Sequence, residues 1–183
     1  MIEICSYRSS WADDFCQQAL ALRAALGSLA LRVDHIGSTS VPGLAAKDVI
    51  DIQVTVEELS VDVVAQLTIA GFVQHVRVGH DHVPPGFSSD TQHWSKLLFL
   101  ERSGDRRCNI HVRRNGMANQ RYPLLFRDYL RVHPATAAAY AELKRRLAVS
   151  LADPKQYPEV KDPAVDLIYL AAEDWAGRTG WQP

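Results

Sequence analysis

Residues 33–56 read VDHIGSTSVPGLAAKDVIDIQVTV. The two ends of this stretch, Val33–Ile36 and Val49–Val56, are rich in β-branched residues and predict two strands. Small residues and the rigid turn Pro42-Gly43 lie between them, and small residues after a strand allow N–H groups and hydroxyls to converge on an anion, usually a phosphate. The alternative is an ordinary connection in which Ser and Thr cap a short helix. The residues concerned are Gly37, Ser38, Thr39 and Ser40.

Asp51 is an acid inside an otherwise apolar strand. An ionised carboxylate there is costly to desolvate unless it meets a cation or hydrogen-bond donors. Strand alternation places Asp51, Gln53 and Thr55 on one face, and the isoleucines and valines between them on the other. If the turn lies beside Asp51, phosphate donors and a metal-binding carboxylate share one cleft. Phosphoryl or nucleotidyl transfer requires that arrangement.

The composition is that of a folded, soluble protein. The 183 residues suffice for one globular domain, and 47% hydrophobic with 22% charged residues is unlike a disordered chain. The net charge of −1 gives no overall field toward nucleic acid or membrane, so any basic site is local and general nucleic-acid binding is not expected. Three scattered cysteines, no N-terminal signal pattern and no membrane-length apolar run predict a cytoplasmic protein with reduced thiols.

The order of the predicted elements indicates an α+β fold, in which a mixed sheet is flanked by helices and the C-terminal third is helical. We expect one domain over residues 1–183, with a sheet core at about 30–115 and C-terminal helices at about 120–177. A long polar loop over 79–93 is expected to cover or line the site. Strands are predicted at 33–36, 49–56, 72–78, 96–101 and 107–113, and helices from near Trp11 to near Gly27, at 57–70, 122–132 and 136–151, and from Pro158 or Pro163 to Asp174.

Several blocks of the chain resemble the GrpB family, which also occurs fused to some dephospho-CoA kinases. They are HIGSTSVPGLAAKDVIDIQV at 35–54, NIHV at 109–112, FRDYLRVHP at 126–134, and the pairs Tyr140 with Lys144 and Tyr157 with Lys161. The family is similar to the nucleotidyltransferase superfamily, so the resemblance implies a small mixed sheet with flanking helices. It also implies that a Gly-Ser turn, here Gly37 and Ser38, binds triphosphate, and that acids such as Asp51 hold Mg²⁺.

The chain departs from that pattern at two places. The superfamily commonly shows an Asp-x-Asp pair, whereas this chain has Asp51-Ile52-Gln53, and the counterpart of a third acid on a later strand is His111. The family usually shows Lys-Pro where this chain has Lys47-Asp48, so Asp48 is an extra carboxylate near the loop and a further candidate metal ligand. Two-metal chemistry normally needs several anionic oxygens.

Basic residues supply the candidate phosphate ligands. Lys47 precedes the Asp51 strand and either reaches a phosphate or is solvated. Arg127 and Arg131 lie one helical turn apart, suited to gripping a phosphate, or to forming a surface ladder with Asp128. Lys144 and Lys161 complete a basic wall if the C-terminal helices fold back over the sheet, whereas Tyr140 and Tyr157 are interpreted as packing residues.

Histidines supply the other candidates. His111 is open to three interpretations: a metal ligand, an acid–base group, or a satisfied half-buried histidine. His80, His82 and His93 in the polar loop are candidates for a transition-metal site, although their spacing is not a regular zinc pattern and a flexible polar loop explains them equally well.

Three functions follow from these candidates. The first is a nucleotidyltransferase-like enzyme in which Asp51, Lys47 and His111 act on a nucleotide or another phosphorylated small molecule with Mg²⁺. The second is a non-catalytic nucleotide- or coenzyme-binding module with a degenerate metal site, which the missing second Asp favours. The third is a metal-dependent enzyme that uses the histidine loop.

Overall fold

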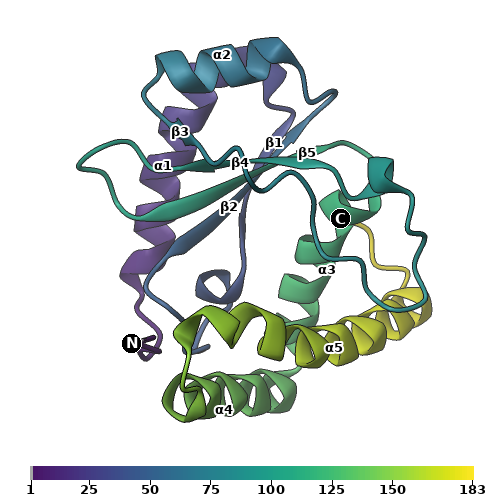
Figure 1. The fold of residues 1–183 in the computed structure, drawn as a ribbon. Helices are drawn as coiled ribbons and strands as arrows, with labels where there is room; N and C mark the ends of the chain where they lie inside the picture. Colours follow the sequence, from purple (N-terminus) through teal and green to yellow (C-terminus); the bar gives the residue numbers. More distant parts are fainter. Residues whose placement is uncertain (1) are drawn as a thin grey trace.

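Five strands form one mixed sheet in the order β1-β2-β5-β4-β3 (Figure 1). The computed structural model describes residues 2–183. The central strands β2 and β5 run parallel, and the other neighbouring pairs are antiparallel. The strands are β1 (Arg32–Ile36), β2 (Ile50–Val56), β3 (Val73–Gln74), β4 (Lys96–Leu100) and β5 (Cys108–Arg114).

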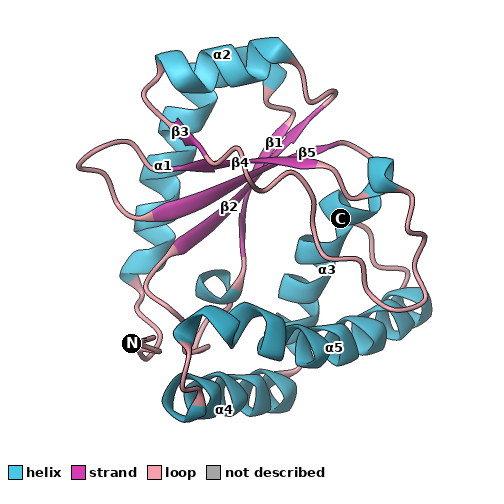
Figure 2. Cartoon of the chain, in the orientation of Figure 1, coloured by secondary structure: helices cyan, strands magenta, loops and turns pink. Residues whose placement is uncertain are grey.

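Helices cover both faces of this sheet, in two separate groups. The first two helices pack on one face, and the last three gather on the side of the other face (Figures 1 and 2). None of the helices within residues 2–183 has the length and apolar character needed to cross a membrane. The helices are α1 (Ser10–Leu26), α2 (Val61–Ile69), α3 (Ala118–Val132), α4 (Pro134–Ser150) and α5 (Tyr157–Thr179).

The alternation along β2 separates an apolar face from a polar face, as the sequence predicts. Ile50, Ile52, Val54 and Val56 are buried with α1 and α2 in one hydrophobic cluster. Asp51 and its alternating neighbours face the side on which α3 lies, and Gln53 donates to the backbone oxygen of a residue in that helix. The site is therefore on the face opposite α1 and α2.

A second hydrophobic cluster joins the last three helices to the loop after β1. It contains Val41, Leu44 and Ala45 of that loop together with buried residues of α3, α4 and α5. The apolar side chains thus form two cores, one beneath the sheet and one within the helical third of the chain.

The structure confirms the α+β class, the mixed sheet and the helical last third, and it corrects several boundaries. The predicted helix at 122–132 begins at Ala118, and the last helix ends at Thr179. The predicted strand at 72–78 shrinks to Val73–Gln74, which pair only with Leu100 and Phe99 of β4. The predicted helix at 57–70 begins at Val61, because the side chain of Ser60 accepts a hydrogen bond from the N–H of Val63 and caps the helix there.

Candidate ligand-binding site

The turn after β1 lies directly against Asp51. In the β1–β2 register Ile36 pairs with Asp51, so the next residue, Gly37, passes beside the carboxylate. Gly37 has φ +68° and ψ −171°, and a Cβ there would lie 2.9 Å from the Cβ of Asp51 and nearer still to its carboxylate. Only glycine therefore fits this position without strain.

Gly37, Ser38 and Asp51 open into one cavity of about 510 Å³ between the sheet and the last three helices. The placement of the turn and Asp51 in a shared cleft is thus confirmed. Four lysines against two aspartates among the lining residues make the cavity attractive to anions. The polar lining residues are Ser38, Thr39, Lys47, Asp51, Lys96, Asn109, His111, Lys144, Lys161 and Asp162, and the aromatic ones are Tyr122, Phe126, Tyr140 and Tyr157.

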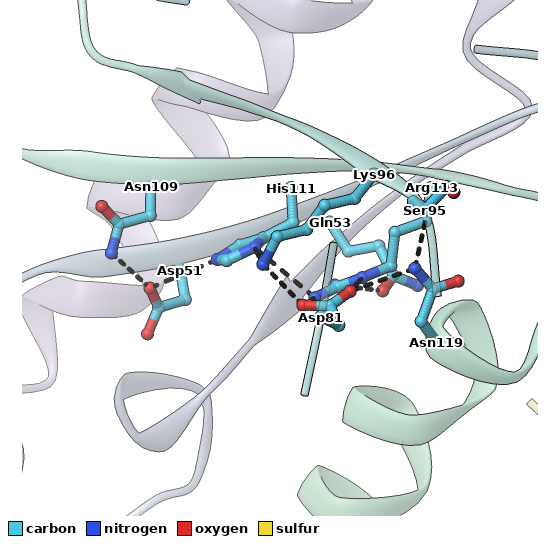
Figure 3. A network of polar contacts seen from close by, with 9 residues as sticks. All are labelled: Asp51, Gln53, Asp81, Ser95, Lys96, Asn109, His111, Arg113 and Asn119. Carbon is cyan, nitrogen blue, oxygen red and sulfur yellow. Dashed lines mark hydrogen bonds and ion pairs between the residues drawn. The ribbon is translucent and has the colours of Figure 1, made fainter. Parts of the chain in front are cut away.

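Asp51 is held by hydrogen-bond donors. The Nδ2 of Asn109 donates to its Oδ1 at 2.8 Å, and Nε2 of His111 lies 3.9 Å from the same oxygen (Figure 3). Burial acts to raise the pKa of Asp51, but these two neighbours outweigh burial and place the pKa below its ordinary value. Asp51 is therefore an ionised carboxylate within the cavity.

His111 lies between Asp51 and two cations. Its Nδ1 is 3.4 Å from Nζ of Lys96 and 3.4 Å from a guanidinium nitrogen of Arg113 (Figure 3). Lysine and arginine only donate, so Nδ1 accepts and the proton of the neutral ring is on Nε2. Burial, followed by the charge of Arg113, lowers the pKa of His111 and favours that neutral ring. In this state the Nε2 proton of His111 faces Asp51, and its roles as metal ligand or base stay predictions.

The cations beside His111 are held by Asp81 from the polar loop. Lys96 and Arg113 face each other across β4 and β5, a pairing of like charges that is unfavourable by itself. Asp81 accepts from Nζ of Lys96 at 2.5 Å and from Arg113 at 2.8 and 2.9 Å, and Asn119 donates to it at 3.0 Å. Burial opposes ionisation, but Arg113 and Lys96 lower the pKa of Asp81 well below its ordinary range.

The sequence patterns did not identify this buried cluster, whose side chains and contacts Figure 3 shows. The polar loop was expected to cover or line the site, and it does contribute Asp81. A second, smaller cavity of about 190 Å³ adjoins the first and is lined by Asp81 and Arg113 among others.

Three predicted lysines converge on the cavity. Nζ of Lys144 donates to Oγ of Ser38 at 2.8 Å and to the backbone oxygen of Ala45 at 2.5 Å. Burial, followed by the charge of Lys161, lowers the pKa of Lys144 to about 7. Burial and the same neighbour also lower the pKa of Lys47, whose ammonium lies 4.0 Å from the ring centre of Tyr157.

The two tyrosines that were interpreted as packing residues have a second role. Tyr157 lies under Lys47, and Nζ of Lys144 is 4.6 Å from the ring centre of Tyr140. Both rings line the cavity, and Tyr140 also belongs to the helical core. Cation–π contacts of this kind orient an ammonium group.

Arg127 and Arg131 lie on one face of α3, as their spacing predicts, but they do not line the cavity. Arg127 donates to the backbone oxygen of His35 at 3.0 Å, and Arg131 donates twice to that of Ser40, at 3.1 and 2.8 Å. Asp128 binds both guanidinium groups. Their expected role as phosphate ligands is corrected: they hold the backbone on both sides of the turn.

The remaining turn residues have mostly internal partners. Oγ of Ser40 donates to the backbone oxygen of Gly37 at 2.6 Å, and Ser40 does not reach the cavity. Thr39 lines the cavity, but its hydroxyl is 3.0 Å from Nε2 of His35. Residues Ser38–Ser40 form a short 3₁₀ turn. Ser40 acts as in an ordinary strand connection, because its hydroxyl binds the backbone of the turn, whereas Ser38 faces the cavity as an anion-binding residue would.

Asp48 is turned away from the cavity, which corrects its expected role as a metal ligand. Its carboxylate accepts from Arg8 at 2.7 Å, from the indole of Trp11 at 2.8 Å, and from Arg106. Burial acts to raise the pKa of Asp48, and the donors from Trp11 and Arg106 lower it overall. Asp48 thus joins the N-terminal segment to the loop before β5.

The histidine loop does not assemble a metal site. His82 pairs with Asp166 of α5 at 3.0 Å, and His80 lies at an isolated bridge with Ser95. Within residues 2–183 there is no group of three His, Cys, Asp or Glu side chains arranged to hold a metal ion. The alternative of a metal site at His80, His82 and His93 is therefore not supported by this arrangement.

The donor set around Asp51 also does not fit a two-magnesium site. Mg²⁺ requires near-octahedral oxygen ligands, and two ions need several carboxylates. Within the described part of the chain, Asp51 is the one carboxylate beside the turn, Gln53 binds Arg113, and cations lie behind His111. The polar neighbours of Asp51 are donors rather than ligands for a metal.

Comparison with known proteins places the chain among relatives of similar sequence. A family model described as GrpB protein matches residues 1–170. The dephospho-CoA kinase of Mycolicibacterium paratuberculosis is 37% identical over 177 residues, which cover 88% of this chain and 44% of that protein. The chain spans about half the length of such curated relatives.

Solved structures give the same result. The crystal structure of the conserved protein GrpB from Enterococcus faecalis has a TM-score of 0.72 and 31% identity, and covers 94% of this chain and 99% of that chain. The Cid1 poly(U) polymerase is a more distant neighbour, with a TM-score of 0.49 and 12% identity over 77% of this chain and 42% of that one. At that distance no property of Cid1 is transferred to this chain.

Proposed function

The chain belongs to the GrpB family, and we propose that it binds a phosphorylated nucleotide or nucleotide-bearing coenzyme in the cavity between the sheet and α3–α5. The phosphate would lie at the Ser38 turn among Lys47, Lys144 and Lys161. The volume of about 510 Å³ is within the range of small-molecule sites.

The observation that carries the proposal is the contact of Lys144 with Ser38. A buried ammonium from α4 meets the hydroxyl of the turn after β1 at 2.8 Å, although 106 positions separate the two residues. Within residues 2–183 Lys144 has no carboxylate partner, and the remaining lysines face the same cavity. A phosphate entering the cavity would supply an anion for Lys144.

The aromatic wall supports a ligand with a planar ring. Tyr122, Phe126, Tyr140 and Tyr157 line the cavity from the side of the last three helices. Aromatic faces stack on nucleobases and tolerate different bases. Because a relative is a dephospho-CoA kinase, dephospho-CoA is a candidate ligand alongside ATP.

Binding is preferred to group transfer because the donor set does not fit the magnesium array that transfer needs. The ionised Asp51 beside the turn favours transfer as the second candidate. Incubation of the protein with ATP or UTP, followed by product analysis, distinguishes the two, since a binding module releases no product.

Isothermal titration calorimetry at pH 6.5, below the pKa of Lys144, tests the proposal with ATP, ADP, UTP and dephospho-CoA. We expect at least one of them to bind, and Lys144→Met to weaken binding about ten- to hundredfold, the value of a charged hydrogen bond. Arg146→Met is the matched control, because this side chain is on the same helix but is 77% exposed. Absence of binding by all four compounds, or equal affinities of wild type and Lys144→Met, would refute the proposal.

A further inference from the structure

Lys96 is a buried lysine on the floor of the cavity, at the first position of β4. Its side chain is 8% exposed, and it lines the cavity alongside Asp51 and His111. Its Nζ lies 2.5 Å from Oδ1 of Asp81, so its position is fixed by an ion pair. Burial lowers the pKa of Lys96, and the carboxylate of Asp81 opposes that shift.

One of the three N–H groups of the Lys96 ammonium has no acceptor within residues 2–183. Asp81 takes one of its three N–H groups and Nδ1 of His111, at 3.4 Å, faces a second. Across residues 2–183 no further acceptor lies within hydrogen-bond distance of this nitrogen. Because Lys96 lines the cavity, the third N–H is available to a ligand there.

The cluster around Lys96 has more positive than negative charge. Asp81 is shared between Lys96 and Arg113, so one carboxylate faces two cations. The other close partners of Arg113, Gln53 and His111, are uncharged. Lys96, Arg113 and Asp81 together therefore carry a net charge of about +1 at neutral pH, and the ionised Asp51 on the other side of His111 is a further anion acting on Lys96.

We propose that Lys96 supplies the positive charge that a metal ion supplies in a magnesium-dependent site, so that the protein binds its phosphorylated ligand in the metal-free form. This inference rests on the proposed function and names the form of the ligand that the same cavity selects. Lys96 would donate to a phosphate oxygen, with Asp81 and Arg113 fixing its position.

The charge of the cavity makes the role of magnesium testable. Chelation by Mg²⁺ removes two negative charges from ATP and occupies phosphate oxygens that Lys96 and the other lysines would contact. Asp51 lacks the neighbouring carboxylates that would compensate by binding the ion, and Asp162 is next to Lys161 at 3.5 Å. Mg²⁺ should therefore weaken binding.

Calorimetry on the intact wild-type protein tests this inference, with ATP and with pyrophosphate, each in EDTA and in saturating Mg²⁺. We expect the Kd of each to be about tenfold lower in EDTA, which is the value of one lost charged hydrogen bond. Lys96→Met should weaken binding in EDTA about ten- to hundredfold and remove most of the difference between the two conditions. Lys155→Met, an exposed lysine outside the cavity, is the control.

The outcomes separate this inference from the proposed function. Binding that is tightened by Mg²⁺, or a folded Lys96→Met with wild-type affinity, would overturn the role of Lys96 and leave the binding function standing. A lack of binding in both conditions would refute the binding function itself and the inference with it. Because the magnesium comparison uses wild type, it decides whether the cavity prefers the metal-free ligand even if Lys96→Met fails to fold.

Discussion

Replacing Gly37 by alanine tests whether the turn and Asp51 lie as close together as the structure places them. The backbone of Gly37, at φ +68° and ψ −171°, is in a region that is essentially restricted to glycine. An added Cβ would also lie 2.9 Å from the Cβ of Asp51, a distance that ordinary side chains do not reach. Two separate penalties therefore act on Gly37→Ala.

Each penalty has an approximate size. The backbone conformation costs on the order of 1–3 kcal/mol for a residue with a side chain. Forcing a methyl group into a filled site adds about 1–3 kcal/mol. We therefore expect Gly37→Ala to lower the free energy of unfolding by about 2–6 kcal/mol, which is a large part of the 5–15 kcal/mol typical of a domain.

Urea unfolding followed by circular dichroism measures this loss. Gly43→Ala is the matched control, because Gly43 has φ +79° but has nothing within 4 Å of its virtual Cβ. The control should lose about 1 kcal/mol from the backbone alone. In an Asp51→Gly background, Gly37→Ala should cost only the roughly 1–3 kcal/mol of its backbone conformation, because the clashing side chain is absent. Equal losses for Gly37→Ala and Gly43→Ala in the wild-type background would refute the close approach.

Three further predictions concern the charged residues. The pKa of Lys144 is about 7 in the folded protein and 10.5 for an ordinary lysine. Between pH 7 and 10.5 the unfolded chain therefore binds more protons at Lys144 than the folded protein does. The free energy of unfolding of wild type, measured against Lys144→Met, should thus rise from pH 7 to 10, while calorimetric affinity for ATP falls. Asp81→Asn should cost about 3–5 kcal/mol in urea unfolding, because two buried cations lose their carboxylate. Since folding lowers the pKa of Asp81, that contribution is present above its ordinary value of 3.8 and disappears as pH falls below it, as an acid titration of wild type against Asp81→Asn will show. Arg131→Met removes both donors to the backbone oxygen of Ser40. Because the Arg131 side chain is 40% exposed, we expect the free energy of unfolding to fall by only about 1 kcal/mol, and the affinity for ATP measured by calorimetry to fall several-fold. Unchanged affinity would contradict the role of Arg131 in holding the turn.

Local patterns were sufficient for the fold and for the centre of the site. The alternation around Asp51 separated the two faces of the sheet, and the small residues from Gly37 onward marked the turn. Both features depend on neighbours in the sequence, which is why they can be read before the strand order is known.

The misassigned residues have partners that are far away in the sequence. Arg127 and Arg131 have the expected spacing, but they bind backbone oxygens. Every residue carries a backbone oxygen, so the sequence does not indicate which one an arginine will bind. Asp48 binds Arg8 and Arg106, from segments 40 and 58 positions away. Such contacts follow from tertiary packing rather than from any periodicity.

The cluster around Lys96 could not be predicted for the same reason. Lys96 and Arg113 become neighbours only through the β4–β5 register, and Asp81 comes from a loop without regular structure. Read along the chain, each looks like an ordinary surface charge.

The division of the apolar residues into two cores affects how this protein can diversify. Asp51 and the turn beside it belong to the sheet, whereas the cavity rings of Tyr122, Phe126 and Tyr140 belong to the helical core. Substitutions in α3–α5 can therefore reshape the aromatic wall of the cavity while the packing of the sheet is left undisturbed. A chimera that takes α3–α5 from a relative, together with its equivalents of Val41, Leu44 and Ala45, should exchange ligand preference as a unit.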